Sequence, residues 1–317
     1  MKCHTDLMIK SEIRTDPIHD RFVIIAPKRG KRPHDVQPTE VPVSSRECPF
    51  CQDPLMRAKG IYTVANPARG KKPSWLVKVV KNKFPVVSPA NPNAYGTQEV
   101  VVETPEHNVE IGELPDAHIM HIFETYIART RALSRDRKIK YILIFKNHGG
   151  KAGASLVHAH SQIFATGFLP PHIIDKLTKG QEYRIAHGTC YYDKLIKKEE
   201  KGPRRIFSDA HMVAFAPWAS IYNYEVWIMP RRHLDNITQL NVQELHSLAA
   251  FTKRIIKKVN ALQISYNFYL HQAITDKEEH FYLRIAPRRD IWAGIELGSR
   301  LIINTVSPES AARYYRS

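Results

Sequence analysis

The chain has 317 residues, of which 43% are hydrophobic and 25% are charged, and its formal net charge is +16. This length and composition are typical of a globular protein with one large or two ordinary domains, and they exclude a disordered chain. The apolar runs are strand-sized, and the N-terminus lacks the apolar core of a signal peptide. We therefore expect a cytoplasmic protein with no membrane partner.

The positive charge is scattered over predicted helices and loops, and no RNA-binding or helix-turn-helix motif accompanies it. A positive field also favours small substrates that carry phosphate, so the charge alone does not indicate a nucleic acid. We therefore expect no nucleic-acid partner. The four cysteines are too few and too unevenly placed for a disulfide framework. Two of them form Cys48-Pro49-Phe50-Cys51, a spacing that suits metal capture or redox chemistry.

The first half of the chain is predicted to combine strands with one amphipathic helix. The helix is expected over 115–134, because apolar residues recur there at intervals of three and four. A glycine-rich stretch, 147–155, precedes the last strand of this half. The strands are predicted at 21–26, 75–81, 98–103 and 141–145 and around His158.

The second half repeats this order. Helices are expected over 242–259 and 307–315, the second with Ser307 as its N-cap. Strands are predicted at 212–215, 225–229, 266–270 and 281–286.

Motifs in the two halves correspond in sequence. The run 99–107 is similar to 225–233, Cys48 and Cys51 parallel 190–193, and His158-Ala159-His160 parallels His280-Phe281-Tyr282. We interpret this as an internal duplication of one α+β unit, with domains at 1–183 and 184–317.

His158 and His160 are the most informative residues of the chain. Two histidines separated by one residue project to the same face of a strand, because side chains alternate with period two. One imidazole could then bind a metal while the other attacks an electrophile. The preceding glycines allow backbone N–H groups to approach a phosphate. The alternative is a pair of buried, hydrogen-bonded histidines in an ordinary strand.

Cys48, Cys51, His107 and His158 supply two sulfur and two nitrogen donors, a set that fits tetrahedral Zn²⁺. Four protein ligands leave no open position, so this site would be structural. The alternative is a reduced Cys-x-x-Cys in a surface turn with two unrelated histidines.

The duplication predicts a second possible metal site in the second half. Its ligands would be Cys190, Asp193, His233 and His280, with an aspartate where the first site has a cysteine. The competing interpretation is a decayed site whose residues only form hydrogen bonds.

Together these motifs resemble the galactose-1-phosphate uridylyltransferase family of the histidine-triad superfamily. The resemblance covers nearly the whole chain, and the shared order of the motifs makes it specific. Besides the cysteine and histidine motifs, it rests on the segments 27–33, 79–85, 103–107, 146–149, 153–155, 217–219 and 294–298.

The resemblance implies two fused histidine-triad-like units, each an antiparallel sheet with packed helices, assembled as a homodimer. It implies that His160 attacks the α-phosphorus of UDP-glucose, and that galactose 1-phosphate then accepts the uridylyl group. A backbone carbonyl near His158 would fix the tautomer of His160. The substrate-binding residues it implies are Arg29, Arg32, Asn82, Asn147, Ser155, Ser161, Gln162 and Glu296.

Ala159 and Ser161 depart from the proline and glycine that many uridylyltransferases carry at these positions. Ser161-Gln162 and the Cys190 motif also resemble the ADP-glucose phosphorylase branch of the family. The alternative function is therefore an ADP-glucose or other nucleotide-sugar phosphorylase or adenylyltransferase. An alternative of another class is a zinc-containing nucleotide-binding protein without turnover.

Overall fold

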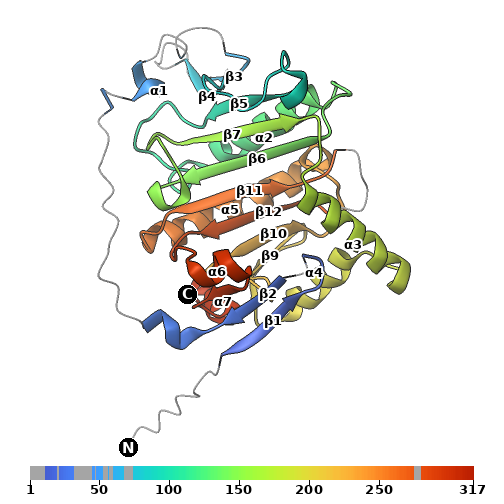
Figure 1. The fold of residues 1–317 in the computed structure, drawn as a ribbon. Coiled ribbons are helices and arrows are strands. Elements are labelled where there is room, and N and C mark those ends of the chain that lie inside the picture. The colour runs from blue at the N-terminus through green and yellow to red at the C-terminus, as the bar shows by residue number, and fades with distance from the viewer. Residues whose placement is uncertain are drawn as a thin grey trace, which may run out of the picture.

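The computed structural model describes residues 11–19, 21–31, 45, 46, 48–52, 56, 60–67, 74–274 and 280–317. Within these residues, no helix is both long enough and apolar enough to cross a membrane. Figure 1 shows a large twisted sheet with the N-terminal strands below it.

The main sheet has ten strands in the order β3-β4-β5-β7-β6-β11-β12-β10-β9-β8, and its paired strands are antiparallel. The order of the first five strands is mirrored by the last five, and β6 pairs with β11 at the centre. The α+β class and the duplication predicted from the sequence are thus visible in the topology. The strands of the first half are β3 (Tyr62–Ala65), β4 (Trp75–Lys81), β5 (Gly96–Val102), β6 (Tyr141–His148) and β7 (His160–Thr166). Those of the second half are β8 (Arg205–Ser208), β9 (Met212–Phe215), β10 (Val226–Pro230), β11 (Tyr266–His271) and β12 (Tyr282–Pro287).

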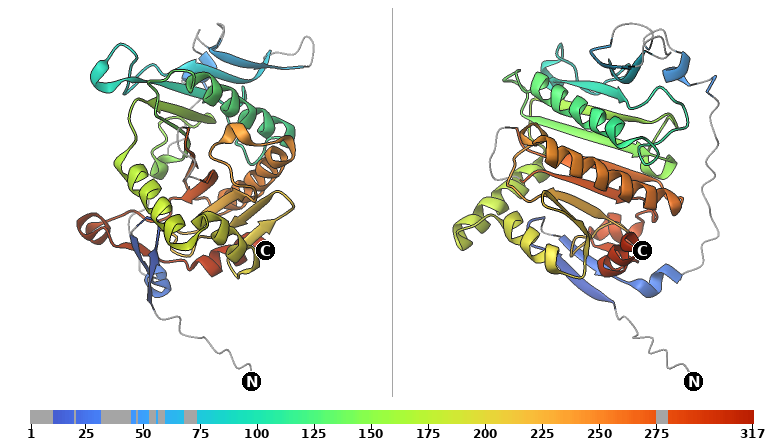
Figure 2. Two further views of the ribbon diagram at one scale, coloured as in Figure 1. Left: turned by 90° about the vertical axis from the view of Figure 1, so that its right-hand side faces the viewer. Right: turned by 180° about the vertical axis from the view of Figure 1, so that it is seen from behind.

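Two long helices cover one face of this sheet, as the rear view in Figure 2 shows. They are α2 (Asp116–Leu133) and α5 (Val242–Ala261), and they occupy equivalent positions in the two halves. Their buried apolar residues form one continuous core with the sheet. The other face carries no such helix layer and is called the open face below.

Most of the remaining elements lie around the lower half of the molecule as drawn in Figure 1. Strands β1 (Glu12–Asp16), β2 (Arg21–Ile25) and β13 (Ile302–Asn304) form a small sheet of their own. The other helices are α1 (Pro49–Gln52), α3 (Pro171–His187), α4 (Tyr191–Lys201), α6 (Gly294–Ser299) and α7 (Pro308–Arg316). Short 3-10 helices are η1 (Pro27–Lys31), η3 (Pro92–Ala94), η4 (Gly150–Ala152) and η5 (Ile237–Gln239).

Most predicted elements coincide with observed ones to within a few residues, but several elements were not predicted. The sequence prediction missed α3 and α4, although α3 ends in a left-handed Gly188 that forms a C-cap. The predicted domain division at residues 183/184 falls within α3, and this division stays a prediction.

Candidate functional site

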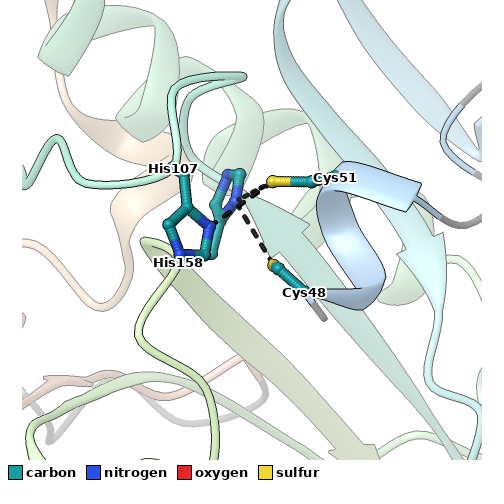
Figure 3. Close-up of side chains that lie close together, drawn as sticks. All are labelled: Cys48, Cys51, His107 and His158. Atoms are coloured by element: carbon teal, nitrogen blue, oxygen red, sulfur yellow. Dashed lines mark hydrogen bonds between the residues drawn. The ribbon is translucent and has the colours of Figure 1, made fainter. Parts of the chain in front are cut away.

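Four side chains that could hold a metal ion lie close together in the first half (Figure 3). The donor atoms of Cys48, Cys51, His107 and His158 all lie within 4.8 Å of one another. The Sγ of Cys51 is 3.4 Å from the Nδ1 atoms of both His107 and His158, and the Sγ of Cys48 is 3.7 Å from Nδ1 of His158. Residues more than 100 positions apart therefore converge as the sequence predicted.

The protonation of this group fits a metal ion. The Nε2 atom of His158 is 2.8 Å from the carbonyl oxygen of Thr104, so its N–H donates there and Nδ1 faces the sulfurs. Burial lowers the pKa of His158, which favours the neutral, ligating form. Burial and the neighbouring Cys48 raise the pKa of the Cys51 thiol to about 11. A divalent cation would offset this effect and stabilise the thiolates.

The second predicted group is assembled in part. Ligand atoms of Cys190, Asp193 and His233 lie within 4.8 Å of one another, with His233 Nδ1 3.4 Å from Asp193 Oδ1. His280 is not a member of this close group, although its ring centroid lies 4.8 Å from that of His233. Its Nε2 is buried and has no hydrogen-bond partner.

His160 is the first residue of β7 and lines a cavity of about 440 Å³ on the open face. Its Nδ1 lies 2.8 Å from the carbonyl oxygen of His158. An N–H at Nδ1 donates to this oxygen, and Nε2 then keeps its lone pair. Burial lowers the pKa of His160, which favours the neutral imidazole near neutral pH. The ring is therefore oriented and protonated as a nucleophile requires.

Three predicted substrate-binding residues share this cavity with His160: Asn82, Ser155 and Gln162. The side-chain oxygen of Gln162 accepts hydrogen bonds from Gln98 Nε2 at 2.7 Å and from Asn82 Nδ2 at 3.4 Å. This arrangement leaves the NH₂ group of Gln162 to donate. The apolar part of the wall, which the sequence prediction did not identify, includes Phe50, Met56, Val80, Phe84 and Val100.

The turn between β6 and β7 depends on glycine for its backbone conformation. Gly149 has φ 80° and Gly153 has φ 78°, values that side chains with a Cβ rarely adopt. A Cβ at Gly153 would meet nothing within 4 Å, so the requirement there is conformational and not steric. Both glycines precede Ser155 and allow the turn to bring this residue beside His160.

The position of Ser161 contradicts its predicted role in substrate binding. Its side chain is buried on the helix-covered face, where its Oγ accepts a 2.7 Å hydrogen bond from the hydroxyl of Tyr126. Because side chains alternate along β7, Ser161 points away from the face that His160 occupies. Its hydroxyl cannot bind a ligand beside His160.

Asn147, Glu296 and Arg29 lie outside the His160 cavity. Asn147 and Glu296 line a neighbouring cavity, and Glu296 Oε2 accepts a hydrogen bond from Ala293 N at the start of α6. Arg29 is exposed on η1, next to the small sheet. Arg32 lies outside the described residues.

A buried ionic group that the sequence prediction missed lies directly behind the start of β7. The fully buried Lys146 places its Nζ 2.8 Å from Glu103 Oε2, 3.2 Å from Glu110 Oε2 and 3.5 Å from the carbonyl oxygen of His160. His148 Nδ1 is 3.2 Å from Glu110 Oε1. Burial alone would raise the pKa of Glu110, but Lys146 and His148 outweigh it and hold this pKa at about 2. The sequence signal was a lysine that directly follows the apolar run 141–145 within one strand.

Comparisons with known proteins give two similarities. Residues 87–170 match the family model described as galactose-1-phosphate uridyl transferase, N-terminal domain. The chain is 32% identical to the galactose-1-phosphate uridylyltransferase of Thermotoga maritima, covering 96% of this chain and 98% of the relative. It is 29% identical to the ADP-glucose phosphorylase of Arabidopsis thaliana, covering 96% and 92%.

Solved structures give the same two similarities. The crystal structure of the Arabidopsis thaliana ADP-glucose phosphorylase with bound ADP-glucose superposes with a TM-score of 0.84 at 28% identity, covering 97% of this chain and 99% of that one. A uridylyltransferase structure superposes with a TM-score of 0.72 at 27% identity, covering 97% and 98%.

Proposed function

The chain belongs to the galactose-1-phosphate uridylyltransferase family, and from this premise we propose that it transfers UMP between UDP-glucose and galactose 1-phosphate through a covalent uridylyl-histidine at His160. The observation that carries the proposal is the state of His160. Its Nδ1 lies 2.8 Å from the carbonyl oxygen of His158, burial lowers its pKa and so favours the neutral ring, and it lines a cavity that also contains amide side chains.

The proposed reaction has two displacements at one phosphorus. The Nε2 lone pair of His160 attacks the α-phosphorus of UDP-glucose, and the bond from phosphorus to the bridging oxygen breaks to release glucose 1-phosphate. A phosphate oxygen of galactose 1-phosphate then attacks the same phosphorus, and the P–N bond breaks to give UDP-galactose. The hydrogen bond to the His158 carbonyl stabilises the positive charge that the ring acquires in between.

The cavity wall supplies groups suited to a nucleotide. The NH₂ of Gln162 and the hydroxyl of Ser155 would donate hydrogen bonds to phosphate oxygens, and Asn82 would bind the nucleoside. Phe50 lies edge-on to His160, with ring centroids 5.3 Å apart, and provides part of an apolar wall for the base.

We further propose that Cys48, Cys51, His107 and His158 hold Zn²⁺. Two thiolates and two neutral imidazoles form a donor set that zinc prefers, and four protein ligands make the site structural. It would fix α1 beside the start of the strand that carries His160. Cys190, Asp193 and His233, with His280 nearby, are the proposed ligands of a second metal.

A homodimer would explain the positions of Arg29 and Glu296. Both lie outside the His160 cavity of their own chain, and exposed apolar side chains lie beside Glu296 at Ile291, Ile295 and Leu297. We propose that this surface packs against a second copy and brings these two residues toward the other subunit's cavity. Sedimentation analysis should then show a dimer, and Leu297→Asp should shift it toward monomer.

Adenylyl transfer with ADP-glucose, as in a phosphorylase, is the second candidate. The 28% identity and 0.84 TM-score to the ADP-glucose phosphorylase structure favour it. The pair Ser161-Gln162, which resembles that branch of the family, also favours it.

Intact-protein mass spectrometry after mixing with UDP-glucose or ADP-glucose tests both candidates. An adduct with the mass of UMP supports the first and an adduct with the mass of AMP supports the second. His160→Gly should remove either adduct while metal content and fold are retained. Absence of any adduct on the wild-type protein with both donors would contradict the covalent mechanism and leave a nucleotide-binding protein without turnover.

A further inference from the structure

A cavity of about 820 Å³ lies on the open face, in front of β6, β11 and β12. Elements outside the repeated strands surround it: the turn between β1 and β2, α3 and α6 (Figure 1). Its floor is largely aromatic, with Tyr141, Phe145 and Tyr269 among the lining residues. One end reaches Asn147, near the strand of the nucleophile. The other end is lined by His19, Arg21, His172, Lys176, His271 and Arg284.

Strand register identifies this second end as the counterpart of the His160 region. In the first half Gln162, two residues after His160, pairs with Phe145. In the second half Arg284, two residues after Tyr282, pairs with Tyr269. The duplication therefore places Tyr282 where the first half has His160, and Arg284 where it has Gln162. By the same correspondence Asn147, two residues after Phe145, matches His271, two residues after Tyr269.

The basic end is also distant from Asn147. Asn267 pairs with Asn147, and His271 lies four residues further along β11. Four residues of strand span about 13 Å. A phosphate at the basic end would therefore occupy a position separate from one held at His160.

Positive charge gathers at this counterpart position. The lining contains Arg21, Lys176, Arg284 and Arg300, whereas Glu296 is the only carboxylate among its described residues. Glu225 compensates the charge of Arg284, with 2.7 Å between Oε1 and Nε. The Nζ of Lys176 lies 3.2 Å from the hydroxyl of Tyr282, which directs the ammonium to this end. Burial lowers the pKa values of His19, His172 and His271, and the charge of Lys176 contributes at each.

Two buried histidine nitrogens at this end have no hydrogen-bond partner among the described residues. His19 is held through Nδ1, 2.8 Å from Asp16 Oδ2, and its side chain is only 7% exposed. Its Nε2 is buried without a partner, and so is Nε2 of His271. A buried polar atom without a partner is unfavourable, so both atoms indicate a ligand that can hydrogen-bond there.

We propose that this end of the cavity binds the phosphate of a phosphate monoester, whose ring lies on the aromatic floor. A nucleoside monophosphate and a sugar phosphate share this chemistry. Arg21 and Lys176 would pair with the phosphate, and His19 and His271 would hydrogen-bond to it. The site binds without catalysing transfer, because Tyr282 stands at the position of the nucleophile and its ring is stacked between Trp227 and His271.

Equilibrium dialysis with AMP, UMP and glucose 1-phosphate, each used separately, tests the proposal without any turnover. At least one compound should bind at two equivalents per wild-type chain. Arg21→Gln and Lys176→Gln should each lose one equivalent, with affinity reduced at least tenfold, whereas Gln162→Ala should lose the other equivalent. Competition by inorganic phosphate would show that the phosphate group alone is recognised, and a preference for one monoester would identify the ring.

Control variants keep the result interpretable. Lys197→Gln removes one charge from an exposed position of the neighbouring α4 and should retain both equivalents. Arg21 is partly exposed, so Arg21→Gln should fold even if Lys176→Gln does not. The proposal is overturned if no compound exceeds one equivalent, if Arg21→Gln retains both, or if Lys197→Gln causes the same loss. Failure of the adduct experiment would leave these outcomes unchanged, since binding at this end requires no reaction at His160.

Discussion

The two halves of the sheet share a backbone plan but differ in what fills the open face. In the first half, Val80 pairs with Val100, and both line the cavity beside His160. At the counterpart positions of the second half, Phe215 pairs with Trp227, and both are buried with Ile18 in an apolar cluster. Aromatic rings thus fill, beside these two strands of the second half, the space that is an open cavity in the first half. Side-chain volume, not strand order, determines which half is open at this position.

The covered face shows a second difference at matching positions. Lys146 of β6 corresponds to Leu270 of β11, and both side chains are buried. At these matching positions only the first half therefore has a buried ammonium with two carboxylates, and this group lies behind His160. Such ionic groups are a weak source of stability compared with apolar packing, so their presence in this half is consistent with a role in the site.

The largest expected effect concerns the two metal-binding groups. Cys51→Ser should remove metal from the first half and lower the free energy of unfolding by more than about 5 kcal/mol, because metal binding contributes directly to folding. Cys190→Ser should cost less, since its group has three close ligands. Metal analysis and urea unfolding measure both effects. Equal losses in the two variants would show that the two groups do not differ as proposed.

The second prediction replaces Lys146 of the first half by leucine, the residue type at the matching position 270 of the second half. Lys146→Leu leaves Glu103 and Glu110 buried without their cation and should cost about 3–5 kcal/mol. Lys140→Leu, the same change at an exposed position just before β6, should stay within about 0.5 kcal/mol. Denaturant unfolding near neutral pH provides the measurement. If Lys146→Leu left the free energy of unfolding unchanged, a leucine, as at position 270 of the second half, would be equally stable in the first half.

The third prediction uses acid to probe the same ionic group. The pKa of Glu110 is about 2 in the folded protein, against 4.5 for an ordinary glutamate. A depressed pKa gives stability that is present above pH 4.5 and is lost as the pH falls toward 2. The contribution is about 3 kcal/mol. Stability measured across this interval should fall less steeply in Glu110→Gln than in the wild type, and identical slopes would disprove the assignment.

The smallest expected effect on stability concerns the N-termini of α5 and α2, which are capped differently. Asn241 accepts a hydrogen bond from Glu244 N in a capping box at the start of α5, whereas α2 begins at Pro115 without a side-chain cap. Asn241→Ala should therefore cost about 1 kcal/mol. Gln243→Ala, an exposed change in the same turn, is the control and should have little effect on the thermal midpoint. Similar shifts for both variants would argue against the cap.

Local sequence patterns predicted much of the site. Spacing and residue type indicated the Cys48 group and the adjacent histidines, because ligand chemistry is a property of the side chains themselves. The periodicity of apolar residues predicted both covering helices. The correspondence of motifs indicated the duplication that the mirrored strand order displays.

The tertiary structure decided which of these side chains share a space. Ser161 follows His160 in sequence yet faces the opposite side of the sheet, where it contacts Tyr126. Glu296 and Arg29 lie away from the His160 cavity, and the carboxylate partners of Lys146 come from segments more than thirty residues distant. Such contacts depend on strand register and on the volume of side chains brought together by folding. Neither quantity is encoded in a short stretch of sequence, so chemistry could be read locally while location could not.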